Sequence, residues 1–262
     1  MRDDPPAGQP LDHARLRAAF AGLRLGTPLI YFPALDSTNS HAAELARAGA
    51  AEGTLVTTDD QTAGRGRIGR AWKSLPGQQL ALSLVLRPAF PPHFLVMASA
   101  LAVAAAIETV AGLTPAIKWP NDVLVDGRKV CGILIETSPG AAILGIGLNV
   151  NGSLVGDDEL AARATTLAEA AGRELSREDL AIALIHRLDG LYALLAGGGT
   201  AARERVRAAW RGRLVTLGRR VSIHQSGAEI AGVAEDVDAD GALLLRRDDG
   251  TLQTITWGDV SS

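Results

Sequence analysis

The sequence has little cysteine, few aromatic residues and no excess of positive charge, and each shortage argues against a class of protein. Cys131 is the one cysteine among 262 residues, so an internal disulfide is excluded and the reducing cytoplasm is favoured. Five scattered histidines show no metal-ligand spacing. A net charge of -3 and an aromatic content of 4% oppose a nucleic-acid-binding protein, which needs a broad basic surface and stacking side chains. Cys131 is predicted to be a small core residue rather than a nucleophile.

Long apolar runs and signal sequences are also missing. The longest apolar stretch without a charge, residues 94–107, is too short to span a bilayer and is rich in alanine, so we predict a buried helix and no membrane segment. Residues 1–10 are polar, acidic and rich in proline, the reverse of a signal peptide, and are expected to form a disordered tail. A hydrophobic content of 47% over 262 residues predicts a globular chain with one large domain, or a large domain and a small one.

Apolar periodicity predicts an α+β fold. Helices are expected over residues 11–25, 40–48, 94–110, 176–195 and 203–210, where leucine and alanine recur or N-cap residues stand in front. Strands are expected over residues 29–32, 54–58, 80–86 and 143–150, where short apolar runs stand between turn residues or alternate. Asp126-Gly127 between two apolar runs predicts a hairpin, and residues 138–140 predict a second turn. These consecutive strands predict a mixed or antiparallel sheet.

The last fifty residues differ in character from the rest. Their short apolar runs are separated by turn signals at residues 225–227, 240–241 and 248–250, a spacing typical of a small β-barrel. We therefore place a domain boundary near Gly212, which divides the chain into a larger domain over residues 11–212 and a barrel over residues 213–262.

The segment from Gln61 to Lys73 concentrates cationic side chains on a glycine-rich backbone. It carries three arginines and a lysine without one acid, and glycine lets backbone N–H groups approach phosphate oxygens closely. Gly64, Gly66 and Gly69 match G-x-G-x-x-G, but no strand directly precedes them and no helix opens at the third glycine. Arg70 stands where a P-loop needs lysine followed by serine or threonine. The pattern predicts a phosphate-binding loop of another kind, with a solvated basic loop as the alternative.

Three further segments carry chemical groups. Lys118-Trp-Pro-Asn-Asp122 places a cation beside the hard oxygen ligands that Mg²⁺ with a nucleotide prefers, although the same residues could simply form a turn. The run from Gly145 to Asn151 ends an apolar strand with glycines and asparagines, a composition that lets a flat ring approach the backbone. Lys129 and Glu136, taken alone, are better interpreted as solvated residues of a hairpin and a strand edge.

Together these segments resemble the biotin protein ligases in order, spacing and residues. The matching pieces are Asp36-Ser-Thr-Asn39, the Gly-Arg-Gly-Arg-x-Gly-Arg loop with Gln61 and Trp72, Lys118 to Asp122, Gly127 to Glu136, Gly145 to Asn151, and Ala164-Thr-Thr-Leu167. The resemblance covers roughly residues 29–260, and the loop combined with Lys118 to Asp122 is its most specific part.

The resemblance implies a fold and a set of roles. The fold would be an α+β catalytic domain like that of class II aminoacyl-tRNA synthetases and lipoate ligases, followed by an SH3-like β-barrel. The biotin-binding residues would be Ser37, Thr38, Asn39, Gln61, Gly64, Arg65, Gly66, Arg67, Lys129 and Gly132. The nucleotide-binding residues would be Arg70, Trp72, Lys118, Asn121, Asn149, Asn151 and Thr165, with Asn121 and Asp122 on the metal. The residues given catalytic roles would be Lys118, Arg67, Lys129 and Asp122.

The implied activity is ATP-dependent formation of biotinyl-AMP and transfer of biotin to a lysine of a biotin carboxyl carrier domain, with Mg²⁺ as the metal. Only about thirty-five residues precede Asp36, too few for the DNA-binding domain of repressor-type members, so no operator binding is expected. A lipoate or octanoate ligase is the nearest alternative, an RNA-binding module is one from another class, and a catalytically dead biotin-binding regulator is the third. The oligomeric state stays open, with a homodimer among the alternatives.

Overall fold

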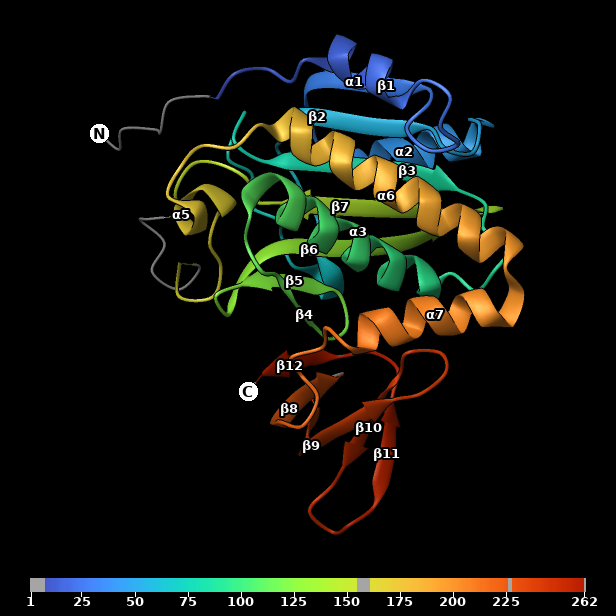
Figure 1. Ribbon diagram of the computed structural model, residues 1–262, viewed down its shortest axis with the longest axis vertical. Coiled ribbons are helices and arrows are strands. Elements are labelled where there is room, and N and C mark those ends of the chain that lie inside the picture. Colours follow the sequence, from blue (N-terminus) through green and yellow to red (C-terminus); the bar gives the residue numbers. More distant parts are fainter. Residues whose placement is uncertain (1–7, 155–160, 226–227, 262) are drawn as a thin grey trace.

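Two β-sheets organise the chain in the computed structural model, which describes residues 8–154, 161–225 and 228–261 (Figure 1). The larger sheet has seven strands in the order β1-β2-β3-β7-β6-β5-β4, and the smaller has five in the order β11-β10-β9-β8-β12. The strands of the larger sheet are β1 (Leu29–Leu35), β2 (Leu55–Gln61), β3 (Leu80–Leu86), β4 (Ala116–Lys118), β5 (Asp122–Val125), β6 (Arg128–Ser138) and β7 (Ala141–Leu148). Strands β1 and β2 run parallel and the other neighbours antiparallel, so the predicted mixed sheet is confirmed.

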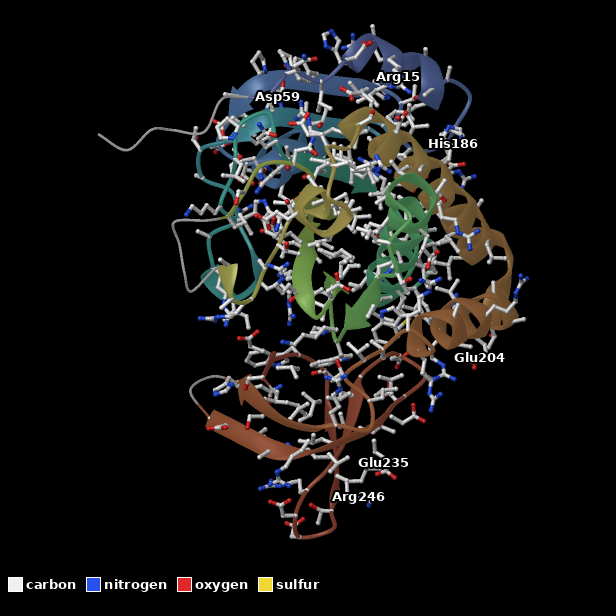
Figure 2. The ribbon with its side chains drawn as sticks, turned by 60° about the vertical axis from the view of Figure 1, so that its left-hand side comes forward. Arg15, Asp59, His186, Glu204, Glu235 and Arg246 are labelled. Carbon is white, nitrogen blue, oxygen red and sulfur yellow. The ribbon has the colours of Figure 1, made fainter. Side chains whose placement is uncertain are left out.

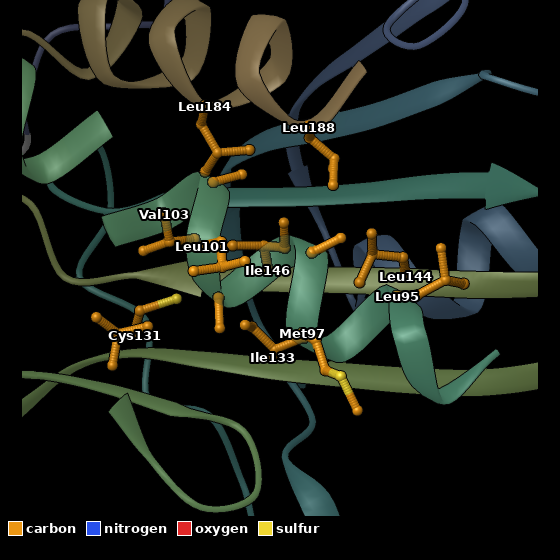
Figure 3. Close-up of a cluster of buried hydrophobic side chains, with 14 of the residues drawn as sticks. Leu95, Met97, Leu101, Val103, Cys131, Ile133, Leu144, Ile146, Leu184 and Leu188 are labelled. Carbon is orange, nitrogen blue, oxygen red and sulfur yellow. The ribbon is translucent and has the colours of Figure 1, made fainter. Parts of the chain in front are cut away.

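Helices cover both faces of the larger sheet, which follows from the period-two alternation of its strands. Val56, Val85 and Ile143 pack against α2 (Thr38–Arg47) on one face. Their neighbours along the strands belong to the main core, under α3 (His93–Ala111) and α6 (Arg177–Gly197) on the other face (Figure 3). All seven residues of β3 are therefore buried.

Local signals set the ends of the helices largely as expected. The Ser37 hydroxyl accepts from the Ser40 N–H to cap α2, and the Ser176 hydroxyl accepts from the Asp179 N–H to cap α6. The leucines expected on one face of α6 are all buried: Leu180, Leu184, Leu188, Leu191 and Leu195. The first helix is shorter than predicted, because α1 covers only His13–Phe20 and Gly22 then adopts a positive φ of 87°.

Helices α3 and α6 are each long and apolar enough to span a membrane, by length and composition alone. Helix α3 is longer than the uncharged run because Glu108 and Thr109 continue it. Buried core helices pass the same test, and 72% of the apolar window of α3 is buried inside the protein, compared with 44% for α6. The expected buried helix over residues 94–110 is confirmed.

The smaller sheet comprises β8 (Arg220–Gln225), β9 (Ala228–Val237), β10 (Leu243–Arg246), β11 (Leu252–Ile255) and β12 (Asp259–Ser261). The turns expected at residues 240–241 and 248–250 connect its strands, whereas that at residues 225–227 lies partly outside the described residues. Short helices α5 (Leu167–Ala171) and α7 (Gly199–Arg211) complete the fold.

The smaller sheet is attached to the larger one at β4. The Ile117 N–H donates to the Arg213 carbonyl and the Val215 N–H donates to the Ile117 carbonyl, both at 2.9 Å. The indole N–H of Trp119 donates to the Gly241 carbonyl at 2.9 Å, and Trp119 is 2% exposed. Trp119 thus joins the two parts of the chain.

Of the tail predicted over residues 1–10, the structure describes residues 8–10, and two of these make backbone contacts. The Gly8 N–H donates to the Pro76 carbonyl at 3.2 Å, and the Gln9 carbonyl accepts from Arg177. These contacts hold the backbone where composition alone predicted a free tail. Residues 1–7 lie outside the described residues.

Candidate functional site

A cleft with a volume of about 1060 Å³ opens over the larger sheet, where β6 and β7 meet the segment from Gln61 to Lys73, called the Gly/Arg loop below. That volume is in the upper range of ligand pockets, so the cleft has room for more than one small ligand. Its lining includes nearly all the predicted site residues: Ser37, Thr38, Asn39, Gln61, Arg65, Gly66, Arg67, Arg70, Trp72, Lys118, Asn121, Asp122, Lys129, Gly132 and Asn149. Residues expected to act together from five separated segments are therefore brought to one place.

Two glycines that face each other across strands form the floor of the cleft. Gly132 of β6 pairs with Gly147 of β7, and the indole of Trp72 lies against both. A Cβ atom at Gly147 would stand 2.7 Å from the indole, and one at Gly132 would stand 3.1 Å from it. Glycine is required here because a flat ring rests directly on the backbone.

A buried amide relay holds the Trp72 ring in place. Its indole N–H donates to Gln79 Oε1 at 3.1 Å, and Gln79 Nε2 donates to Asn149 Oδ1 at 3.2 Å. Asn149 Nδ2 in turn donates to the Thr165 carbonyl at 3.1 Å. Sequence reasoning missed Gln79, which is 4% exposed; its position directly before the apolar strand β3 was the available signal.

The end of the cleft nearest α2 is a polar pocket. Gln61 Oε1 accepts from both the N–H and the hydroxyl of Thr38, at 2.9 and 3.0 Å. The Ser83 hydroxyl lies 2.7 Å from Thr38 Oγ1 and 2.6 Å from Asn39 Oδ1. Ser83 was missed, although it is the one polar residue inside the apolar run of β3. These fixed donors and acceptors suit a small polar head group.

Glu136 was interpreted as a solvated edge residue, and the structure corrects this. Strand β6 lies inside the sheet, and the Glu136 carboxylate accepts from Asn39 Nδ2 at 2.7 Å. Arg65 donates to the same oxygen at 2.9 Å. The acid thus ties the Gly/Arg loop to the polar pocket, a contact between residues 71 positions apart that no local pattern reveals.

The opposite end of the cleft is rich in cations. Lys129 Nζ lies 2.7 Å from Asp122 Oδ1 and 5.8 Å from the centre of the Trp72 ring. Arg67 Nη1 donates to Asn121 Oδ1 at 2.7 Å. Lys118 lines the same end, and within the described part of the chain its side chain has no hydrogen bond or ion pair. Such an end suits phosphate or carboxylate groups.

The Gly/Arg loop also contacts the smaller sheet. Arg67 Nη2 donates to the Gly258 carbonyl at 3.3 Å, and Arg70 forms an ion pair with Asp259. Burial lowers the pKa of Arg67 from its ordinary value, and the neighbouring carboxylates of Asp122 and Asp259 oppose that shift. The loop therefore bridges the two parts of the chain over the mouth of the cleft.

Three predicted site residues lie outside the lining of this cleft. Gly64 instead pairs its backbone with Trp72, whose N–H donates to the Gly64 carbonyl at 2.8 Å. Both ends of the Asn151 amide bond the backbone of Leu175, at 2.9 and 3.0 Å. Thr165 is fully buried and donates to Glu169 Oε2 at 2.8 Å. Gly64 thus contacts the site through its backbone, whereas Asn151 and Thr165 use their side chains to bond neighbouring residues outside the cleft.

Cys131 is fully buried beneath the floor, as predicted for a core residue. Burial raises the pKa of its thiol, because the thiolate would lose its hydration. A thiol in this state is a poor nucleophile at neutral pH.

Comparison with known proteins agrees with this geometry. Residues 31–153 match the biotin/lipoate A/B protein ligase family, and residues 216–261 match the biotin protein ligase C-terminal domain. The Mycobacterium tuberculosis biotin--[acetyl-CoA-carboxylase] ligase is 32% identical over 99% of this chain and 98% of its own length. The Bacillus subtilis bifunctional ligase/repressor is 35% identical over 95% of this chain and 78% of its own length. The Aquifex aeolicus biotin protein ligase solved with biotin and ATP superimposes with a TM-score of 0.79 at 29% identity, over 90% of this chain and 98% of that one.

Fold and cleft thus define a protein of the biotin/lipoate ligase class, in which a mixed sheet carries the site and a second sheet follows. Within that class, the chain belongs to the biotin protein ligase family.

Proposed function

We propose that this chain activates biotin with ATP to form biotinyl-AMP and then transfers biotin to a lysine of a carrier domain. The observation that carries the proposal is the division of one cleft into a polar pocket, a flat floor and a cationic end. The ureido ring of biotin suits the polar pocket, and the tail of biotin suits the flat floor. The carboxylate of biotin and the triphosphate of ATP suit the cationic end. Family membership and one relative solved with biotin and ATP support the assignment.

The roles follow from position in the cleft. The polar pocket of Thr38, Gln61 and Asn39 would bind the head of biotin, with Arg65 and Gly66 above it and Ser37 at the start of α2. The floor at Gly132 would support the tail. Trp72, Asn149 and Arg70 would contact the nucleotide, and Lys118 its phosphates.

The donor set at Asn121 and Asp122 fits a magnesium ion carried by a nucleotide. Among the described residues no group of three acidic, histidine or cysteine side chains could hold a metal ion by itself. Asn121 Oδ1 already accepts from Arg67, and one Asp122 oxygen pairs with Lys129. Mg²⁺ takes most of its ligands from phosphates and water, so one or two protein oxygens suffice. When bound, the ion would neutralise phosphate charge.

The chemistry requires positioning and charge stabilisation rather than a protein nucleophile. Biotin's carboxylate oxygen bonds to the α-phosphorus of ATP, and the bond to pyrophosphate breaks. Lys129 lies where the cationic end meets the floor, and the new mixed anhydride would form there. The amine of the acceptor lysine then attacks the adenylate carbonyl, loses a proton and releases AMP.

Finer features of the proposal come from the family resemblance. The catalytic domain would be related to class II aminoacyl-tRNA synthetases, and the five-stranded sheet would be an SH3-like barrel that begins near residue 213. The enzyme would act in the cytoplasm on a biotin carboxyl carrier domain.

Pyrophosphate release tests the proposal without any acceptor. Purified protein is incubated with Mg-ATP and either biotin, lipoate or octanoate. We expect pyrophosphate with biotin alone among the three acids. Release with lipoate or octanoate but not with biotin would contradict the assignment and favour the nearest alternative.

Arg67→Gly is expected to let the adenylate escape. A mixed anhydride reacts with water or stray amines, so the enzyme must hold it until the acceptor arrives. Loss of one arginine hydrogen bond to a charged ligand should speed adenylate dissociation by about tenfold. The measurement is the dissociation rate of radiolabelled adenylate from each protein.

Arg15→Gln serves as the control, because Arg15 forms an exposed ion pair with Asp179 on the outer surface (Figure 2). It should retain adenylate like the unaltered protein. Equal retention in Arg67→Gly would mean that Arg67 is an ordinary loop residue.

A further inference from the structure

Arg177, the first residue of α6, is an arginine in an unfavourable position. A cation in the first turn of a helix opposes the helix dipole, and a buried guanidinium loses its hydration. Yet the side chain is only 5% exposed, and it was not among the predicted site residues. Some specific set of contacts must offset both penalties.

The planar guanidinium group of Arg177 contacts three acceptors. Arg177 Nη1 lies 2.9 Å from Asp59 Oδ1 and donates to the Gln79 carbonyl at 3.0 Å. Its Nη2 donates to the Gln9 carbonyl. The fork thereby fixes the positions of segments that lie far apart in the sequence, which a lysine could not do with the same geometry.

Asp59, labelled in Figure 2, is the matching hub on β2. Its carboxylate accepts from the Leu11 N–H at 3.1 Å and from the Tyr31 hydroxyl. Burial, together with this hydrogen bond, raises the pKa of Tyr31 to about 12, so the phenol stays protonated and keeps donating. The Asp59 carboxylate thus accepts from three donors on three different segments.

The link from this hub to the cleft is Gln79. Its backbone carbonyl accepts from Arg177, while its side chain accepts from the Trp72 indole and donates to Asn149. A shift of the Gln79 backbone therefore moves the two side chains assigned to the nucleotide. Thr38, Gln61 and Asn39 of the polar pocket have no hydrogen bond to Gln79 among the described contacts.

We propose that Arg177 is a positioning residue for the nucleotide end of the cleft, acting through Gln79 on Trp72 and Asn149. The inference rests on the proposed function. A buried ion pair adds little stability over apolar residues of the same volume, so its value lies in fixing one geometry. Arg177 therefore sets the affinity for ATP more than the affinity for biotin.

The test compares Arg177→Gln, Arg177→Lys and Tyr31→Phe with the unaltered protein in steady-state pyrophosphate release. Arg177→Gln should raise the KM for ATP about tenfold, with kcat lowered by less than about threefold and the KM for biotin within about twofold. Arg177→Lys keeps a positive charge beside Asp59 but lacks the forked guanidinium. Its KM for ATP should therefore lie between that of the unaltered protein and that of Arg177→Gln. Tyr31→Phe should also give an intermediate KM, and it covers the case in which Arg177→Gln does not fold.

Tyr192→Phe is the matched control. Tyr192 lies on the same helix, is buried, and donates to Glu52 away from the cleft. This variant removes a buried hydrogen bond, so it should lower the Tm without raising the KM for ATP.

Acrylamide quenching of Trp72 gives a readout that needs no turnover. The Trp72 contribution is the difference between each protein and its Trp72→Phe counterpart, and Arg177→Gln should make that contribution more accessible. An unchanged KM for ATP and unchanged quenching in folded Arg177→Gln would overturn the inference, as would equal rises in both KM values. If the unaltered protein released no pyrophosphate from biotin and ATP, the proposed function would fail, and quenching alone would still decide whether Arg177 positions Trp72.

Discussion

Replacement of Lys129 with methionine is expected to lower the rate of biotin-dependent pyrophosphate release by about 100- to 1000-fold, the usual effect of removing one charge-stabilising donor at a reacting centre. Lys129 Nζ lies beside Asp122 and next to Gly132, where the cationic end of the cleft meets the floor. Its charge would therefore face the oxygens that become more negative as the anhydride forms. Methionine keeps much of the aliphatic length without the ammonium group. Rapid-quench measurement of adenylate formation reports the step directly.

Lys118→Met is the comparison, and it ranks the two lysines that sequence reasoning could not separate. Lys118 lies at the end of β4, two strands away from Gly132 of the glycine floor. It should contribute to phosphate binding, and its loss should cost about tenfold. Both variants should keep the Tm within a few degrees, because each lysine is partly exposed. A larger loss for Lys118→Met than for Lys129→Met would reverse the assignment.

Gly147→Val is expected to weaken biotin binding by about 100-fold, because branched carbons added to a filled site cost up to about 3 kcal/mol. The first added carbon alone would stand 2.7 Å from the Trp72 indole. The ring cannot simply move aside, since Gln79 holds its N–H and Gly132 lies beneath it. The clash would therefore distort the floor that is proposed to support the tail of biotin. Isothermal titration with biotin measures the change.

Gly190→Ala gives a glycine control, because Gly190 lies within α6 and an added Cβ would meet nothing within 4 Å. It should bind biotin normally and gain a little stability, since alanine favours helix. Unimpaired biotin binding by folded Gly147→Val would show that the ligand does not use this floor.

The sequence predicted features that depend on neighbouring residues. Asp126-Gly127 fixed a two-residue turn with positive φ at both positions, so the β5–β6 hairpin was readable directly. The leucine spacing of α6 was equally direct. The predicted length of helix α1 was too long, because leucines continue past Gly22 in the sequence. The backbone conformation of Gly22 is not helical, and the helix ends before it.

The candidate site was predicted where residue type limits the chemistry, and missed where packing decides. Arginines and lysines in the Gly/Arg loop and beside Asp122 have few roles other than binding anions. Asn151 looked equivalent to Asn149, yet its amide bonds the Leu175 backbone instead of facing the cleft. Glu136 and Arg177 acquire their importance only from partners far away in the chain, which one sequence does not identify.

The most direct test of the account is the intact mass of a biotin carboxyl carrier domain after incubation with this protein, biotin and Mg-ATP. The account predicts a mass increase of one biotinyl group per domain, dependent on ATP and absent when the acceptor lysine is replaced by arginine. An unchanged domain mass, under conditions in which an established biotin protein ligase labels the same preparation completely, would contradict it.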